Sequence, residues 1–247
     1  ADNPYFARNI VNRFWGYLMG RGLVEPLDDM RATNPASNPE LLDALAADFV
    51  AHKFDQKHLM RQIFRSRAYQ LSSAVTSGNE ADGANTHFAR YTVKRLTAEQ
   101  LADALDFATG TQEKYDGVPI GTRAIQLPDT SYKSYLMDTF GRPARQVVCE
   151  CERTSKPNIA QALHLLNGDF LNNKIANAKG RVEQLVKQKK PANAIVEELY
   201  LATISRLPTP DEQAKALGWI KSAPSEKEGL QDLLWVLLNS KEFLFVH

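Results

Sequence analysis

Apolar residues recur every three or four positions over most of the chain, and this spacing places them on one face of an α-helix. Asn3 and Pro4 have the order of an N-cap followed by proline at the first helical position, and Gly20 ends the apolar stripe after them. Asn38 and Pro39 repeat this start. The pattern therefore predicts a helix from Pro4 to Gly20 and a second helix that begins at Pro39.

Capping signals mark further helix starts. Asp55 precedes an apolar stripe that runs to about Ala68. Thr97 with Gln100, and Thr209 with Glu212, have the spacing of a capping box, in which two side chains satisfy backbone N–H groups reciprocally. The remaining predicted helices begin after Pro157, at Asp169 (continuing to Leu185), at Pro191 and before Leu230, and the last one ends near Asn239.

The helical spacing fails in two places. Residues 72–92 are rich in Ser, Thr, Asn and Gly and predict a loop, whereas residues 111–148 carry several Gly and Pro without any helical period. Short strands over 123–127 and 146–149 fit this second stretch. We expect an all-α fold in one domain over residues 1–247, with helical halves 1–110 and 155–247 joined by an irregular segment, 111–154. Long irregular segments are often functional.

Composition restricts the function classes. The 30 Lys and Arg nearly balance the 29 Asp and Glu, which argues against a nucleic-acid-binding protein or one that binds an anionic membrane surface. The apolar run 233–238 is too short to span a bilayer. The chain begins at Ala1 without an initiator Met or a signal sequence, so we expect it to be part of a longer protein.

Motifs of several enzyme classes are missing from the sequence. It has no G-x-S-x-G, no H-E-x-x-H, no Walker loop, no EF-hand loop and no C-x-x-C-H for covalent haem. These absences favour a non-catalytic protein, although an enzyme of another class stays open.

The two cysteines, Cys149 and Cys151, lie one residue apart. Three interpretations are open for this pair: structural thiols packed against helices, a disulfide, or a metal site with His164 as a third ligand. C-x-C is tighter than the usual C-x2-C spacing of zinc ligands, and a second cysteine pair is missing. His164 itself lies in an apolar helical stretch, where a buried and hydrogen-bonded histidine is the commoner case.

Charged residues near the first predicted helix suggest structural ion pairs. Asp28 and Asp29 lie in a turn-rich stretch close to Arg21, and such a carboxylate pair can serve acid–base chemistry or cation binding. A salt-bridged turn between helices is the commoner use of such a cluster. We expect buried ion pairs that lock helix junctions, formed by Arg13, Arg21, Asp28, Asp29 and Arg153.

Carbohydrate binding is a further, weaker candidate function. It requires an exposed, coplanar set of rings, for which the candidates are Tyr115, Tyr132 and Tyr135.

Several short blocks, in order along nearly the whole chain, resemble the planctomycete-specific PSD domain of unknown function. The blocks are NRFW (12–15), GRGLVEPLDD (20–29), NPELLD (38–43), SRAYQLSS (66–73), LTAEQL (96–101), CECER (149–153), QALHLLN (161–167) and LLNSKEF (237–243).

This resemblance gives no catalytic residue, because the family has no agreed activity, but it implies where the protein works and what else its chain contains. It implies an exported, extracytoplasmic protein with further N-terminal domains, often including a planctomycete cytochrome c domain, and any haem would belong to such an upstream domain. It also makes a disulfide between Cys149 and Cys151 somewhat more plausible, because exported thiols are more often oxidised.

We expect a non-catalytic interaction module without a cofactor of its own. Its expected partners are its own N-terminal domains or other envelope proteins, with residues 111–148 and 20–29 as contacts. A thiol- or metal-based redox site at Cys149 and Cys151, serving electron transfer, is the alternative.

Overall fold

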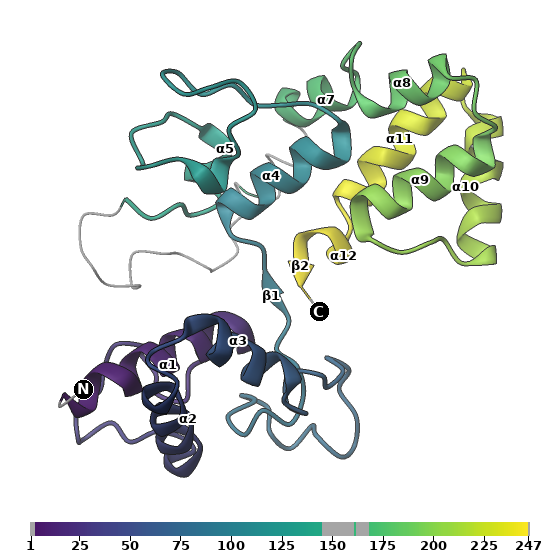
Figure 1. The fold of residues 1–247 in the computed structure, drawn as a ribbon. Coiled ribbons are helices and arrows are strands. Elements are labelled where there is room, and N and C mark those ends of the chain that lie inside the picture. The colour runs from purple at the N-terminus through teal and green to yellow at the C-terminus, as the bar shows by residue number, and fades with distance from the viewer. Residues whose placement is uncertain (1–2, 145–160, 162–167, 247) are drawn as a thin grey trace. The chain divides into compact units, whose positions relative to one another are not determined.

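The structure is a computed structural model, and it describes residues 3–144, 161 and 168–246. Its elements follow one another along the chain as drawn in Figure 1: α1 Pro4–Met19, α2 Pro39–Ala51, α3 Gln56–Arg65, β1 Lys94–Arg95, α4 Ala98–Thr109, the 3-10 helix η1 Ala124–Gln126, α5 Tyr135–Thr139, α7 Asp169–Ile175, α8 Arg181–Lys187, α9 Ala192–Ile204, α10 Pro210–Ser222, α11 Glu226–Leu238, α12 Lys241–Leu244 and β2 Phe245–Val246. The predicted all-α fold is confirmed, since β1 and β2 form a single two-stranded sheet within the described residues.

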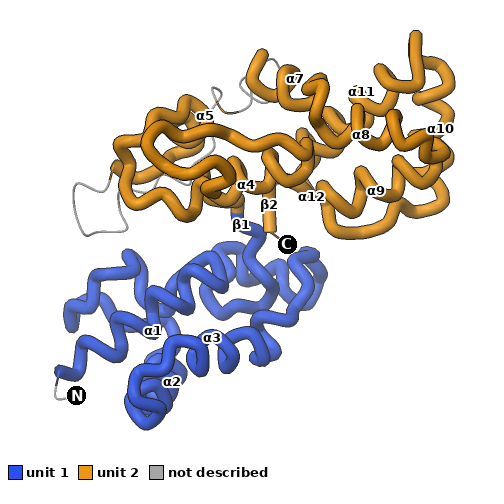
Figure 2. The backbone as a smooth tube through the Cα atoms, turned by 45° about the horizontal axis from the view of Figure 1, so that its top comes forward, with its two compact units in different colours: residues 1–94, 247 blue, residues 95–246 orange. Residues whose placement is uncertain are grey.

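The chain divides into two compact units, which Figure 2 colours separately. Unit 1 comprises residues 1–94 with residue 247, and unit 2 comprises residues 95–246. The division thus precedes α4, a helix that the sequence pattern placed in the first helical half. The expectation of one domain over residues 1–247 stays a prediction.

Unit 1 is built on three helices. The apolar face of α1 packs with α2 and α3 in one buried cluster, whose larger members are Val11, Trp15, Met19, Leu42, Phe49, Leu59 and Ile63. Gly20 ends α1 in the left-handed conformation, with φ 78°, which glycine adopts without steric cost. Residues 66–93 contain neither helix nor strand, as predicted for 72–92. The Phe88 ring of this loop lies nearly perpendicular to the Trp15 ring, with the ring centres 5.2 Å apart.

Unit 2 packs α4 against the C-terminal helices. Its larger buried residues come from α4, α7, α8, α9 and α11 and include Leu101, Leu105, Leu171, Val182, Leu199, Leu230 and Leu234. The irregular segment contributes Tyr115, and α5 contributes Leu136 and Met137, to the same core. The last turn of the unit is tied to its start by a hydrogen bond of 3.1 Å from the Leu96 N–H to the Leu244 carbonyl.

Two local predictions for unit 2 were wrong. A 3-10 turn, η1, stands where a strand over 123–127 was expected, because the Asp103 carboxylate accepts hydrogen bonds from the backbone N–H groups of Ala124 (2.6 Å) and Ile125 (3.3 Å). The helix expected from Asp169 to Leu185 is interrupted between Ile175 and Arg181, and Gly180 in the break lies against the Thr109 carbonyl. The predicted strand at 146–149 and most of the helix after Pro157 fall outside the described residues.

Within the part of the chain that the structure describes, we find no helix that combines the length and the apolar character needed to cross a bilayer.

Candidate functional site

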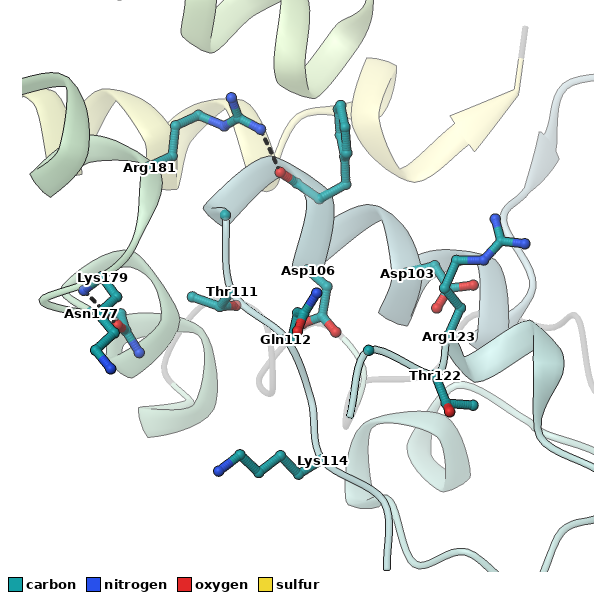
Figure 3. A pocket seen from close by; sticks show the side chains of 13 residues that line it. Asp103, Asp106, Thr111, Gln112, Lys114, Thr122, Arg123, Asn177, Lys179 and Arg181 are labelled. Atoms are coloured by element: carbon teal, nitrogen blue, oxygen red, sulfur yellow. Dashed lines mark hydrogen bonds between the residues drawn. The ribbon is translucent and has the colours of Figure 1, made fainter. Parts of the chain in front are cut away.

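A hollow in unit 2 lies at the C-terminal end of α4. It has a volume of about 730 Å³ and lies where the end of α4, the irregular segment and the break between α7 and α8 meet (Figure 3). Its lining consists of Asp103, Asp106, Phe107, Gly110, Thr111, Gln112, Lys114, Gly121, Thr122, Arg123, Asn177, Lys179 and Arg181. We call this hollow the α4 pocket.

Arg181 forms the wall between α4 and α8. Its guanidinium donates to two carbonyls at the end of α4, from Nε to Ala108 at 2.8 Å and from Nη2 to Phe107 at 2.7 Å. Figure 3 marks the second of these bonds with a dashed line. The guanidinium also lies 5.3 Å from the centre of the Phe107 ring. A cation at a helix C-terminus complements the helix dipole and satisfies carbonyls that lack helical partners. Arg181 therefore has a structural role in this wall.

The two carboxylates of the α4 pocket are also engaged in the fold. Asp103 caps η1, as described above. Asp106 accepts a hydrogen bond of 2.8 Å from the Glu113 N–H, and its other oxygen binds the Lys174 ammonium group. Both oxygens of the Asp106 carboxylate are therefore engaged in contacts within the fold. The pocket thus lacks an uncommitted acid–base pair among its described residues.

The other basic residues of the pocket differ from Arg181. Lys114, Arg123 and Lys179 are exposed, and within the described ranges their side-chain cations form no ion pair. Lys114 comes from the irregular segment and Lys179 from the break before α8 (Figure 3). With Arg181, four basic residues face two acidic ones, so the pocket favours an anionic group such as a carboxylate or a phosphate.

The cysteine-based site predicted from the sequence lies outside the described residues. Cys149, Cys151, Arg153 and His164 all belong to the stretches that the structure does not describe.

The expected ion pairs of unit 1 are arranged as follows. Arg13 on α1 contacts Asp28 with 2.5 Å between Nε and Oδ1, and both side chains are 27% exposed, so this pair is half-buried. Asp29 pairs with Arg31, which is 77% exposed. Arg21 donates to the Ala84 carbonyl at 3.4 Å. In the described residues the turn is therefore held by ion pairs and by a backbone contact together.

The tyrosine platform expected for carbohydrate binding is not formed. Tyr115 is 9% exposed and belongs to the core, where burial and the neighbouring Asp106 raise the pKa of its phenol. The Tyr132 ring meets it edge to face, at an interplanar angle of 83°, whereas Tyr135 is 71% exposed. One buried ring and one perpendicular ring do not form the flat, exposed platform that the expectation requires.

Two features of the structure were missed by sequence reasoning. Asn12 is completely buried in α1 and holds the loop after it through hydrogen bonds to Val24 and Leu27. An asparagine inside an amphipathic stripe was the signal for this role, because asparagine is a poor helix former. The lysines of the α4 pocket had no such signal, because Lys114 and Lys179 are isolated in sequence and only tertiary packing brings them together.

Comparison with known protein families identifies a family for this chain. A family model described as PSD1, a protein of unknown function (DUF1553), covers residues 1–220. No curated protein and no solved structure matches the chain.

Proposed function

Since the chain belongs to the PSD1 family of proteins of unknown function (DUF1553), we propose that it is a non-catalytic interaction module of a larger exported bacterial protein. In this proposal the α4 pocket binds an acidic segment of another domain of the same protein. The module has no cofactor of its own, and its work is to hold that domain in place.

One observation carries the proposal: the acidic side chains of the α4 pocket are engaged in the fold, while three of its basic side chains are exposed and form no ion pair in the described residues. A site with cations directed to solvent and carboxylates used structurally suits recognition of a negative group better than proton transfer.

Apolar side chains beside the pocket favour a polypeptide over a small anion. Phe107 lines the pocket and is 67% exposed. Ile120 and Ile125, which flank the lining residues 121–123 in sequence, are 81% and 53% exposed. Exposed apolar groups next to charged ones are typical of protein interfaces, in which an apolar centre is surrounded by a polar rim.

Site-specific photo-cross-linking in the full polypeptide that carries this chain tests the proposal. A photoreactive amino acid would replace Lys114 in one variant and Lys179 in another, with exposed Lys221 of α10 as the matched control. We expect the first two variants to cross-link to an acid-rich segment elsewhere in the same protein, and the control to give no such product. Equal cross-linking from all three positions would contradict the proposal.

Charge reversal gives the second readout. The double substitution Lys114→Glu and Lys179→Glu should weaken docking by about tenfold or more, since like charges then face each other, whereas Lys221→Glu should leave it unchanged. Catalytic turnover that is lost in the double variant would show instead that the pocket is an active site.

A further inference from the structure

A cluster of two histidines and one aspartate lies in unit 1, at the hairpin between α2 and α3. Asp48 lies in the last turn of α2, and His52 follows it by four residues as the C-cap, so both lie on the same face of the helix. His58 belongs to the first turn of α3. Neither histidine has a part in the α4 pocket, so this cluster is independent of the function proposed above.

The three side chains are already in contact. His58 Nε2 lies 2.8 Å from Asp48 Oδ2, and His52 Nδ1 lies 3.2 Å from Asp48 Oδ1. The two imidazole rings stack with their centres 3.7 Å apart and their planes at 15°. One potential ligand atom from each residue lies within 4.8 Å of the other two.

The hairpin that carries the cluster is held in one conformation. Lys53 and Phe54 both have positive φ, 55° and 62°, which costs free energy for residues other than glycine. Packing stabilises this turn, because the Phe54 ring meets Phe49 at 5.4 Å and Phe6 at 5.6 Å, both edge to face. The cluster is therefore attached to a rigid frame, which reduces the entropy that a bound ligand must remove.

We propose that Asp48, His52 and His58 form a binding site for a divalent transition-metal ion, with Zn²⁺ as the expected occupant. Imidazole nitrogen suits zinc, copper and nickel, whereas magnesium and calcium prefer oxygen ligands, so two histidines with one carboxylate select the transition-metal group. Three protein ligands leave room in a tetrahedral site for water or for a group of a binding partner.

Binding requires only local movement. The hydrogen bond between His58 Nε2 and Asp48 Oδ2 contains one proton. The metal ion takes the place of that proton, which is released to solvent, and both atoms become ligands. His52 is 48% exposed, so its ring can turn out of the stack to direct a nitrogen at the ion. The side chains of His58 and Asp48 are 21% and 35% exposed, which lets the ion enter from solvent.

Calorimetric titration of the tag-free chain with zinc chloride tests the site. Because thiols also bind zinc, the titration is done on the Cys149→Ser, Cys151→Ser background as well as on the unsubstituted chain. We expect one equivalent of Zn²⁺ to bind in this background. His52→Ala and His58→Ala should each lower the affinity at least about tenfold, the size of effect seen when even indirect partners of a metal site are removed.

His87→Ala is the matched control, since His87 lies in the loop of unit 1 and outside the cluster. It should leave the affinity unchanged, and circular dichroism should show native helix content in every variant. Electron paramagnetic resonance with Cu²⁺ as a substitute probe should show two coordinated nitrogens in the background chain and one after His52→Ala. The proposal is overturned if Zn²⁺ binding disappears with the cysteines, or if the His52→Ala, His58→Ala double variant binds as well as the control.

Discussion

Asn12 illustrates how much one side chain contributes to unit 1. Its Nδ2 donates to the carbonyls of Val24 and Leu27, each at 2.9 Å, and its Oδ1 accepts from the Val24 N–H at 2.9 Å. These bonds give the loop after α1 the pairing that a strand or a helix would otherwise supply. A buried polar side chain satisfied in this way is worth far more than its exposed counterpart, because the alternative is an unpaired backbone group in the core.

Replacing Asn12 by Ala should lower the free energy of unfolding by about 3 kcal/mol, since the substitution leaves two loop carbonyls and one N–H without their partner. Urea unfolding followed by circular dichroism measures this change. Asn9→Ala in the same helix is the control and should stay within about 0.5 kcal/mol of the unsubstituted chain. Equal effects of the two substitutions would mean that the Asn12 bonds contribute nothing net.

At the scale of elements, local signals near helix ends were the reliable part of the sequence. Asn3, Asn38, Asp55, Thr97 and Thr209 were all predicted to begin helices, and each is an N-cap whose side chain accepts a backbone hydrogen bond. Such bonds join residues two or three positions apart, so neighbouring sequence contains all the information they need.

Elements that depend on distant residues were less predictable. α5 is only five residues long, Tyr135–Thr139, and lies within a stretch that had no helical period. It is stabilised by burial of Leu136 and Met137 in the core of unit 2, to which helices far along the chain also contribute. Propensity cannot predict one helical turn whose stability comes from tertiary packing.

Ion pairs of Arg206, in the loop before α10, connect the N-terminus of α10 to α12. Thr209 and Glu212 form the capping box, and Arg206 binds both Glu212 and Glu242 of α12 at 2.8 Å. The hydrogen bonds from Arg206, and then those from Thr209, lower the pKa of Glu212 from its ordinary value of 4.5 to about 2. A lowered pKa in the folded state means that the ionised carboxylate stabilises the fold.

Glu212→Gln should therefore show a pH-dependent effect. Gln keeps the capping geometry but loses the charge, so the melting temperature should fall by about 2 to 4 °C at pH 7, as for an exposed ion-pair network worth about 1 kcal/mol. The contribution of the Glu212 charge to stability is fully present above pH 4.5 and is lost as the pH falls toward 2. The melting temperatures of the variant and of the unsubstituted chain should therefore converge over that interval. A difference that persists unchanged at pH 2 would assign the effect to the cap and not to the charge.

At the scale of the whole molecule, the residues that the structure describes form two hydrophobic cores. The core of unit 1 is built from residues up to Phe88, and the core of unit 2 begins at Ala98. A unit with its own hydrophobic core can unfold cooperatively by itself.

Differential scanning calorimetry of the intact chain should therefore resolve two transitions. Asn12→Ala should lower only the transition of unit 1. Gly229→Ala should lower only that of unit 2, because a Cβ on Gly229 of α11 would lie 2.8 Å from the Ile220 Cα of α10. A single transition that both substitutions shift would show that the two cores unfold as one.

The sequence by itself determined the helical class, the positions at which most helices begin, and the family. Caps, prolines and apolar spacing act over a few residues, so they can be recognised without knowing the fold.

Only the tertiary structure decided which charged and metal-binding side chains lie close together. The break between α7 and α8 supplies Asn177 and Lys179 to the α4 pocket, and the first residue of α8 supplies Arg181. The α2–α3 hairpin brings His52 against His58. Gly218 and Gly229 both lie inside helices, yet a Cβ would meet open space at the first and backbone at the second. Such differences depend on contacts between residues far apart in the chain, and those contacts form only when the helices pack.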